Sequence, residues 1–320
     1  MKENKQRSFL KEAKKNKNDE FYTQLSDIER ELIHYEVNFR NKIVFCNCDD
    51  PLISNFYKYF AVNFKRLGLK KLISSCYKRQ ADSGEYQRGY YYEYNGLKEE
   101  KMIPDLQDVN YFEGNGDFRS QESLELLKKS DIVVTNPPFS LFREYIDVLV
   151  KNDKKFLVIG NINCITYKEI FKLIKENRAW LGINLGRGIS GFIVPEEYEL
   201  YGTETKIDEF GNRIVSSNNC LWLTNLDNFK RHENIILTKQ YYGNEEEYPK
   251  YDNYDGINVN KTQNIPYDYT GTVGVPITFL HKFNPEQFEI IKFRKGNDEK
   301  DLSINGKCPY FRILVKLKTV

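Results

Sequence analysis

The chain lacks any run of apolar residues long enough to span a bilayer, and no apolar core of a signal peptide follows its basic N-terminus. These two absences predict a soluble, cytoplasmic protein. An excess of one charge is also missing, because 48 Lys and Arg face 46 Asp and Glu, for a net charge of only +2. Any affinity for nucleic acid must therefore come from a local basic surface.

Patterns typical of zinc sites and disulfide frameworks are absent as well. The six cysteines include no CxxC pair, and the three histidines are far from them in sequence. Buried free thiols in a reducing compartment are the favoured interpretation, and we expect neither metal nor disulfides. The sequence also contains no internal repeat, and no low-complexity tract beyond a lysine-rich start.

The chain does have 320 residues, enough for one large domain or two moderate ones, and an unusual number of aromatics, with 23 Tyr and 21 Phe. Such a surplus is compatible with core packing, with base stacking, or with both. Residues 1–18 carry seven Lys or Arg against two Glu. This basic arm is either a solvated flexible tail or a clamp for a polyanion.

Residues 19–180 alternate between buried-strand and amphipathic-helix patterns. Strands are predicted at residues 42–48, 70–77, 109–118, 131–136 and 154–162. Helices are predicted at residues 19–35, 49–69, 120–130, 140–152 and 166–177. This alternation predicts an α/β fold with a Rossmann-like, mostly parallel sheet and helices on both faces.

From about residue 181 the pattern changes to long polar loops rich in Gly, Asn, Tyr and Asp. We expect strands at residues 220–226 and 277–283 there, and a helix at residues 285–293. This half is predicted to be a loop-rich mixed α/β region. Loops of such length inside a folded domain are often functional, so a surface-reading role fits them.

The segment DIVVTNPPFS, residues 131–140, joins a buried strand to a rigid polar corner. In an open parallel sheet the ligand lies beyond the carboxyl ends of the strands. The Asn136 side-chain oxygen and the Pro137 carbonyl are two acceptors suited to an amino group with two hydrogens, and Phe139 can stack on a flat ring. The tetrapeptide alone is equally consistent with a plain turn.

A site of this kind can activate the exocyclic amine of adenine, which is a poor nucleophile because its lone pair is delocalised into the ring. Two acceptors that hold the N–H bonds out of the ring plane would localise the lone pair and stabilise the charge that develops during attack on an activated methyl group. If the electrophile is an activated methyl group, such a corner needs no strong base before the amine attacks.

Three short motifs carry a family resemblance. NPPF at 136–139, including Pro138, resembles motif IV of the amino-group DNA methyltransferases. DEFYT at 19–23 resembles the motif that lines the S-adenosylmethionine pocket in the N6-adenine class. GDF at 116–118 resembles motif III, whose acid contacts the cofactor adenine, although G-x-G-D alone is a common tight turn.

Longer stretches extend the likeness over nearly the whole chain. FCNCDDP, NFYKYFAVNF, GFIVPE, NNCLWLTNLD and KCPYFRIL resemble the EcoRI-type adenine-specific DNA methyltransferases, and the motif order is gamma-like. The resemblance implies S-adenosylmethionine-dependent methylation of N6 on a flipped adenine in double-stranded DNA, at the second adenine of GAATTC, by a monomer that protects DNA from a restriction endonuclease.

The resemblance also divides the chain and its candidate residues. It implies a basic arm at 1–18, a cofactor-binding catalytic core at 19–180, and completion of the core with target recognition at 181–320. The catalytic candidates are Asn136, Pro137, Pro138 and Phe139. The cofactor-binding candidates are Phe21, Tyr22, Thr23, Asn47, Asp49, Asp117 and Phe118. The DNA-binding candidates are Lys14 and Lys15 of the basic arm, and, by residue type only, Arg187, Arg213, Asn218, Asn219 and Lys261.

The chain departs from the general methyltransferase pattern at two strand ends. The first strand ends in FCNCDDP instead of a glycine-rich turn, so Asn47 or Asp49 is expected to meet the amino-acid end of the cofactor by side chain. The second strand, LISSCY, lacks the acid that usually holds the ribose hydroxyls. Ser75 or a carboxylate from elsewhere must take that place.

Two other functions remain open at this stage. RNA and protein-glutamine methyltransferases can use the same kind of corner, and a non-catalytic DNA-binding module could retain an inactive nucleotide fold. The intact corner at 136–139 argues against the module.

Overall fold

The computed structural model describes residues 22–78, 87–185, 190–194, 205–208, 211–215 and 219–318. The chain divides into two compact units. The first unit comprises Met1–Lys172 and Leu181–Leu226, and the second comprises Leu173–Trp180 and Asp227–Val320. Within the described ranges, no helix has the length and hydrophobicity that crossing a bilayer requires.

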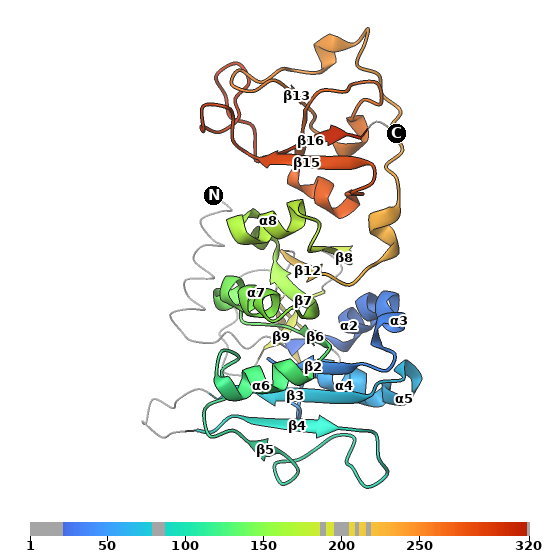
Figure 1. The fold of residues 1–320 in the computed structure, drawn as a ribbon, viewed down its shortest axis with the longest axis vertical. Helices are drawn as coiled ribbons and strands as arrows, with labels where there is room; N and C mark the ends of the chain where they lie inside the picture. Colours follow the sequence, from blue (N-terminus) through green and yellow to red (C-terminus); the bar gives the residue numbers. More distant parts are fainter. Residues whose placement is uncertain are drawn as a thin grey trace. The chain divides into compact units, whose positions relative to one another are not determined.

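An eight-stranded sheet, ordered β5-β4-β3-β2-β6-β7-β12-β8, is the framework of the first unit (Figure 1). Its strands are β2 (Ile43–Cys46), β3 (Lys71–Cys76), β4 (Tyr90–Tyr94), β5 (Asn110–Tyr111), β6 (Ile132–Thr135), β7 (Lys155–Asn161), β8 (Trp180–Leu185) and β12 (Cys220–Thr224). The four central strands, β3-β2-β6-β7, run parallel, whereas β4 and β12 join them antiparallel. The prediction of an α/β fold with a mostly parallel central sheet is confirmed.

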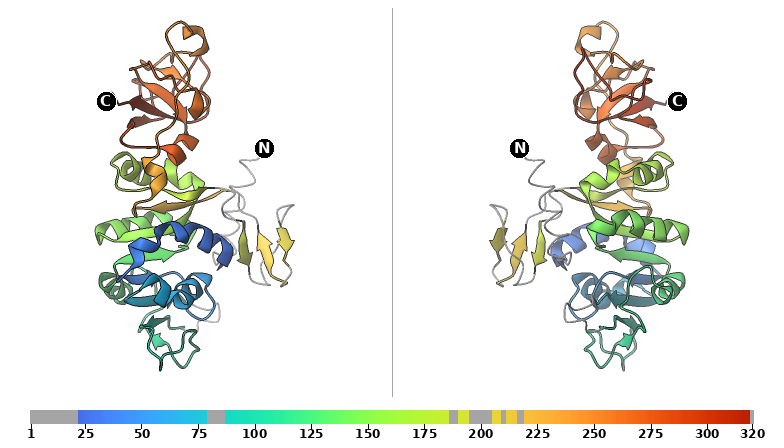
Figure 2. Two further views of the ribbon diagram at one scale, coloured as in Figure 1. Left: turned by 90° about the vertical axis from the view of Figure 1, so that its right-hand side faces the viewer. Right: turned by 90° about the vertical axis from the view of Figure 1, so that its left-hand side faces the viewer.

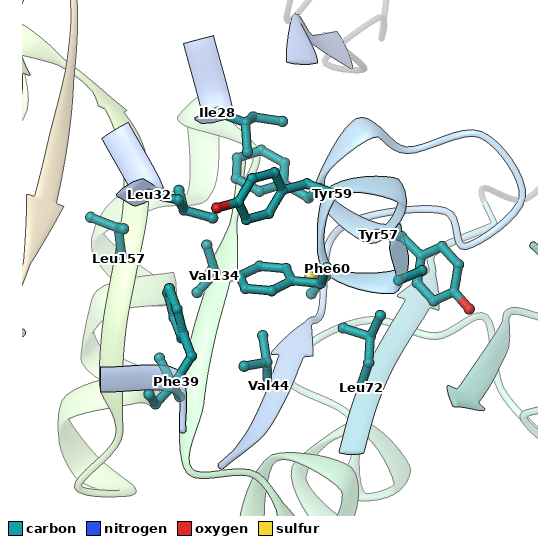
Figure 3. Close-up of a cluster of buried hydrophobic side chains, with 14 of the residues drawn as sticks. Ile28, Leu32, Phe39, Val44, Tyr57, Tyr59, Phe60, Leu72, Val134 and Leu157 are labelled. Atoms are coloured by element: carbon teal, nitrogen blue, oxygen red, sulfur yellow. The ribbon is translucent and has the colours of Figure 1, made fainter. Parts of the chain in front are cut away.

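Helices cover both faces of this sheet. The helices that precede β3 are α2 (Leu25–Leu32), η1 (Ile33–Tyr35), α3 (Glu36–Phe39), α4 (Asn55–Val62) and α5 (Phe64–Leu67). Leu32 and Phe60 from this group pack with Val134 and Leu157 of the sheet in one buried cluster (Figure 3). The opposite face carries α7 (Phe142–Lys151), and its Phe142 ring lies so close to β7 that a Cβ atom at Gly160 would come within 2.7 Å.

For the helix predicted at 49–69, the structure confirms the predicted end but not the predicted start. Its predicted end at Gly68 is confirmed, because Gly68 caps α5 with φ 63°, a left-handed conformation that glycine adopts without strain. Its predicted start at Asp49 is wrong. The helix begins at Asn55, where the Ser54 hydroxyl caps it by accepting from the backbone N–H of Phe56 at 3.0 Å.

The remaining helices of the alternating region lie close to their predicted positions. They are α6 (Gln121–Lys129), capped by Ser120, α7, and α8 (Lys168–Lys175). The 3-10 helix η2 (Phe139–Leu141) leads into α7, and the 3-10 helix η3 (Ile162–Thr166), which follows β7, was not predicted. The described part of residues 79–103 contains β4, which pairs antiparallel with β3.

A small antiparallel sheet, ordered β1-β9-β11-β10, also belongs to the first unit. Its strands are β1 (Tyr22–Thr23), β9 (Phe192–Val194), β10 (Thr205–Ile207) and β11 (Arg213–Val215), and Figure 2 shows the last three, in yellow, side by side. The pairing of Thr23 with Phe192 connects the start of the described chain to a segment about 170 residues further on.

The second unit contains a four-stranded sheet, ordered β13-β14-β16-β15. Its strands are β13 (Ile257–Asn258), β14 (Val273–Pro276), β15 (Phe288–Phe293) and β16 (Arg312–Leu317). Short 3-10 helices, η5 (Phe229–His232), η6 (Glu245–Glu247), η7 (Thr262–Asn264) and η8 (Ile277–Lys282), interrupt its loops.

Two sequence predictions in the second unit are wrong. The helix predicted at 285–293 is strand β15, in which Phe288 and Ile290 are buried while Glu289 between them is exposed, and pairing with β16 fixes this alternation. The strand predicted at 277–283 is the 3-10 helix η8, which follows Pro276. Short apolar runs do not distinguish the two states without their tertiary partners.

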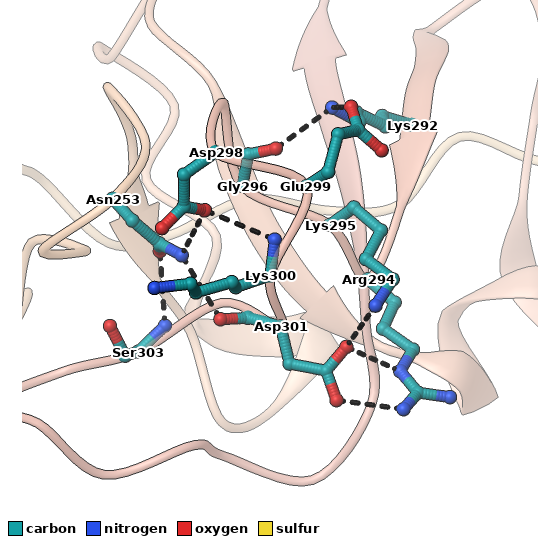
Figure 4. A network of polar contacts seen from close by, with 10 residues as sticks. All are labelled: Asn253, Lys292, Arg294, Lys295, Gly296, Asp298, Glu299, Lys300, Asp301 and Ser303. Carbon is teal, nitrogen blue, oxygen red and sulfur yellow. Dashed lines mark hydrogen bonds and ion pairs between the residues drawn. The ribbon is translucent and has the colours of Figure 1, made fainter.

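Polar contacts close the loop that follows β15 (Figure 4). Arg294 donates from Nε and Nη2 to the two carboxylate oxygens of Asp301, at 2.8 and 2.7 Å, and holds the pKa of Asp301 down at about 2. Asn253 donates to Asp298 at 2.9 Å and accepts from the backbone N–H of Ser303 at 3.2 Å. This bidentate ion pair and the amide contacts fix the geometry of the loop.

All six cysteines lie in the described part of the chain and are free thiols. Cys46, Cys76, Cys164 and Cys220 are buried, and Cys48 is half-buried. The expectation of a buried thiol is wrong at Cys308, which is exposed.

Candidate active site

The Asn-Pro-Pro-Phe corner begins directly after Thr135, the last residue of β6. All four residues of β6 are buried, so the strand delivers Asn136 to the carboxyl edge of the sheet. Pro137 is buried, and Pro138 is extended with φ −61° and ψ 121° before the chain turns into η2 at Phe139. Two proline rings therefore restrict the backbone between a rigid strand and a helix.

The loop after β2 lies beside this corner because β2 and β6 are parallel neighbours. The backbone N–H of Cys48 donates to the Thr135 hydroxyl at 3.2 Å, and that hydroxyl donates to a carboxylate oxygen of Asp49. Asp49 also accepts from the backbone N–H of Asn136. Asn47 and Asp49, predicted from the departure in FCNCDDP, are thus brought to the catalytic candidate Asn136.

Asp49 is only 8% exposed, and burial raises its pKa from 3.8 to about 6. Hydrogen bonds from Thr135, Ser54 and the Asn136 backbone act in the opposite direction and favour the ionised form. The Ser54 hydroxyl donates to Asp49 Oδ1 at 2.7 Å, so both carboxylate oxygens have partners within the protein.

Asn47 contacts a residue that the sequence analysis missed. The Tyr145 hydroxyl, from α7, donates to Asn47 Oδ1 at 2.5 Å, and the Phe118 ring packs edge-on against the Tyr145 ring with centroids 5.1 Å apart. Tyr145 is fully buried, which raises its pKa. In sequence it is one apolar position of an amphipathic helix, and nothing in that pattern distinguishes it from ordinary core.

Asp117 is the last residue of the GNGD turn that follows the short strand β5, and Phe118 comes directly after it. The Asp117 carboxylate is paired with Arg119, whose Nε and Nη2 donate at 2.9 and 2.7 Å and hold the pKa of Asp117 below its usual value. Arg119 also bonds Glu144 of α7 at 2.7 Å. The structure therefore links Phe118 to Asn47 through Tyr145, while Asp117 is oriented by an arginine.

Thr23 is the best-described residue of the DEFYT motif. Phe21 lies outside the described residues, and Tyr22 is described only as backbone in β1. Thr23 is 3% exposed, its carbonyl accepts from Asn55 Nδ2 at 2.9 Å, and its hydroxyl has no hydrogen-bond partner among the described residues. A buried hydroxyl without a partner is costly, so a ligand that bonds it would relieve that cost.

Phe192 is a second residue that the sequence analysis did not select. It pairs with Thr23 across β1 and β9, and its ring lies edge-on to Phe139 with centroids 6.1 Å apart. The small sheet therefore connects the DEFYT segment to the aromatic residue of the corner. The stretch GFIVPE, which carries part of the family resemblance, was the available signal for Phe192.

A carboxylate does lie beside the end of β3, where the sequence lacks the expected acid. Asp50, from the loop after β2, accepts from the Tyr90 hydroxyl at 2.7 Å and from the Cys76 thiol at 3.4 Å, and Lys78 Nζ is 4.0 Å away. Ser75 is buried and donates to the Asn47 carbonyl at 3.2 Å. Asp50 is half-buried and Ser75 is buried, so Asp50 has the more accessible side chain of the two candidates for the missing acid.

Comparison with known proteins identifies the family of this chain. Residues 9–318 match the family described as adenine-specific methyltransferase EcoRI. The chain belongs to this family. It is an adenine-specific DNA methyltransferase of the type II modification class, and this membership favours DNA over RNA or protein glutamine as substrate.

The similarity to known relatives covers nearly the full length of this methyltransferase. The chain is 67% identical over 322 residues to the type II methyltransferase M.EcoRI of Escherichia coli, with 99% of each chain covered. It is 40% identical to M.MpnI of Mycoplasma pneumoniae over 326 residues, and 38% identical to M.MgeORF184P of Mycoplasma genitalium over 333 residues. Those two alignments cover 96% of this chain and 98% of each relative. No significant match to a solved structure was found.

The DNA-binding candidates of this methyltransferase are less completely placed. Lys14, Lys15, Arg187 and Asn218 lie outside the described residues. Asn219 precedes β12, and its carbonyl accepts from the backbone N–H of Ile162 at 2.6 Å, just beyond the carboxyl end of β7. Asn219 is therefore on the same edge of the sheet as Asn136.

Two further candidates lie on other elements. Arg213 begins β11 in the small sheet and pairs with Val194. Lys261 is exposed at the start of η7 in the second unit.

Proposed function

We propose that this methyltransferase transfers a methyl group from S-adenosylmethionine to N6 of a flipped adenine in double-stranded DNA, at the second adenine of GAATTC. We further propose that it acts as a monomer and protects DNA from a restriction endonuclease. The observation that carries the proposal is the Asn136 corner at the carboxyl edge of a parallel sheet, anchored to the adjacent loop through Thr135 and Asp49.

The chemistry required of the chain's own residues is positioning and electrostatic stabilisation. The Asn136 amide oxygen and the Pro137 carbonyl accept the two hydrogens of the adenine amine, and Phe139 supports the ring. As the amine attacks, positive charge develops on its nitrogen, and preorganised acceptors stabilise that charge most strongly in a site from which water is excluded. No strong base is needed before attack.

Several residues around the strand ends fit a bound nucleoside cofactor. The buried Thr23 hydroxyl offers a donor and an acceptor without competing protein partners among the described residues, and Asp50 offers a carboxylate beside the end of β3 for ribose hydroxyls. Asn47, Asp117 and Phe118 also remain proposed contacts of the cofactor. S-adenosylmethionine would supply the reactive methyl group, bonded to a positively charged sulfur.

Duplex DNA is proposed to reach the corner by extrusion of the target base. Extrusion costs a few kcal/mol, which phosphate contacts and base-edge contacts must offset. Asn219 lies on the edge of the sheet where the flipped base would enter, and its position supports a DNA-facing role. Arg213 and Arg187 remain proposals by residue type.

Restriction protection tests the proposed target. Plasmid DNA prepared from cells that express this chain should resist a nuclease that cuts at GAATTC, because methylated sites are not cleaved. Plasmid from cells that express the Asn136→Ala variant at the same level is the matched control and should be cut. Full cleavage of both plasmids would contradict GAATTC as the target.

Deletion of residues 2–17 tests the basic arm, which includes Lys14 and Lys15. We expect weaker DNA binding and a flatter plot of log affinity against log salt, because each lysine that neutralises a phosphate releases counterions. Affinities measured by fluorescence anisotropy over a series of salt concentrations give the slope.

A full-length variant with the arm lysines replaced by glutamine separates charge from chain length. It should reproduce the flatter slope of the deletion. An unchanged slope in both variants would show that the arm is a tail without a role in binding.

A further inference from the structure

Asp49 is attached to four parts of the fold at once. Its carboxylate accepts from the Ser54 hydroxyl at the start of α4, from the Thr135 hydroxyl at the end of β6, and from the Asn136 backbone. Its backbone N–H donates to the Ser75 carbonyl at 3.2 Å, and its carbonyl accepts from the Ser74 hydroxyl at 2.5 Å, both in β3. A side chain held in this way has a single position.

The contacts of the carboxylate converge on the start of the corner. Thr135 is the last residue of β6 and Asn136 is the first residue of the corner, so one rigid group fixes both sides of the peptide that joins them. The direction in which the Asn136 side chain leaves the backbone depends on that peptide. The next residue, Pro137, has no N–H, so the backbone of the corner cannot be held by a donor at that position.

The same contacts leave little room for a direct role with the cofactor. Both carboxylate oxygens already have partners in the protein, and the residue is buried. The Ser54 and Thr135 hydroxyls and the Asn136 backbone N–H already take three of the roughly four acceptor positions of the carboxylate. This geometry separates Asp49 from its neighbour Asp50, which is half-buried and points to the end of β3.

A carboxylate at this position also has an energetic cost. Burial raises the pKa of Asp49 to about 6, which means that the ionised form is less stable here than in water. A neutral residue could fill the same space without that cost, and costly buried ionisable groups are typical of functional sites.

We propose that Asp49 is a positioning residue for methyl transfer, which holds Thr135 and the Asn136 backbone so that the Asn136 amide oxygen is aimed at the target amine. The inference rests on the proposed function, because it gives Asn136 the role described there.

Asp49→Asn is the first test, because it keeps the size of the side chain and removes its charge and one acceptor. We expect kcat to fall by about 10- to 100-fold, because a small misplacement of a reacting group can lower the rate by up to about 100-fold. The KM for duplex DNA and the Kd for S-adenosylmethionine should change by no more than about threefold, since Asp49 touches neither ligand. Steady-state methylation at varied DNA concentration measures kcat and KM, and isothermal titration calorimetry measures the Kd.

Thr135 provides a second, independent test. Thr135→Val removes the hydroxyl that joins Asp49 to the strand, whereas Thr135→Ser keeps it. Thr135→Val should lower kcat in the same way, and Thr135→Ser should restore it to within about threefold of wild type. The double variant Asp49→Asn/Thr135→Val should lose no more kcat than Asp49→Asn alone, because both changes break one connection.

Glu31→Gln is the matched control, since Glu31 is also a fully buried carboxylate with backbone N–H partners but lies away from the corner. Its kcat should stay within about threefold of wild type at a temperature where the variant is folded. A similar fall in kcat for Glu31→Gln and Asp49→Asn would show that loss of any buried carboxylate lowers activity, and would overturn the inference.

The remaining outcomes separate this inference from the proposed function. If Asp49→Asn keeps kcat near wild type, or if it mainly weakens cofactor binding, Asp49 is not a positioning residue. If it does not fold, the two Thr135 variants decide the matter, and equal kcat for Thr135→Val and wild type overturns the inference. Absence of DNA methylation by the wild-type enzyme would instead contradict the proposed function.

Discussion

Replacing Asn136 with alanine is expected to abolish methyl transfer, with a fall in the single-turnover rate of at least about 1000-fold, the upper range for loss of one preorganised polar group in a transition state. The variant loses the side-chain acceptor, while the strand, both prolines and Phe139 remain. Binding of S-adenosylmethionine should be largely unchanged, because Asn136 is proposed to contact the target amine. Incorporation of labelled methyl groups and calorimetric titration of the cofactor measure the two quantities.

Conservative variants at the same position sharpen this test. Asn136→Asp and Asn136→Ser keep an oxygen acceptor at this position. They should retain more activity than Asn136→Ala. Methylation by Asn136→Ala within tenfold of wild type would remove Asn136 from its proposed role, whatever the other two variants do.

Replacing Glu31 with alanine is expected to lower the free energy of unfolding by about 3–5 kcal/mol, the cost of leaving the partners of a buried charged group unsatisfied. Glu31 is 0% exposed and accepts four hydrogen bonds. The backbone N–H groups of Ile183 and Asn184 donate at 2.7 and 2.8 Å, the Asn184 side chain at 2.9 Å, and the Tyr35 hydroxyl at 3.0 Å. The carboxylate thereby ties α2 to β8.

Urea unfolding monitored by circular dichroism checks this expectation. Glu29→Ala on the same helix is the control, since Glu29 is exposed and its removal should change stability by less than about 0.5 kcal/mol. Equal stability of the two alanine variants would show that the Glu31 contacts contribute nothing to folding.

The pH dependence of the Glu31 contribution has a defined sign. Burial raises the pKa of Glu31 above its ordinary value of 4.5, so the folded state binds the proton more tightly than the unfolded state. Wild-type stability from this group is fully present below pH 4.5 and is lost as pH rises through the pKa of the folded state. Glu31→Gln cannot ionise, so its stability relative to wild type should increase over that interval, as measured by urea unfolding at several pH values.

The proposed catalytic edge of this methyltransferase is assembled from elements that are distant in sequence. Asp49 follows β2, Thr135 ends β6, and the Phe139 ring meets Phe192 of the small sheet. A substitution that shifts any of these elements can lower activity without touching a ligand. Activity measurements on variants of this enzyme therefore need a parallel measurement of cofactor binding and of folding.

Several features of this protein depend only on residues that are close in sequence, and the sequence alone determined them. A buried strand followed by Asn136, two prolines and Phe139 identifies a rigid acceptor corner, because proline geometry and side-chain chemistry do not depend on distant contacts. The same is true of the helix end at Gly68 and of the alternation that predicts a mostly parallel sheet. The family resemblance was likewise carried by short stretches of sequence.

Only the tertiary structure decided which groups meet at that corner. Asp49 and Thr135 are 86 residues apart, and Tyr145 is 98 residues from Asn47, so no local pattern connects them. The segment at 288–293 is a strand because β16 lies beside it, although its composition also suits a helix. Burial and pairing come from contacts between distant segments, and a sequence specifies those contacts only through the fold as a whole.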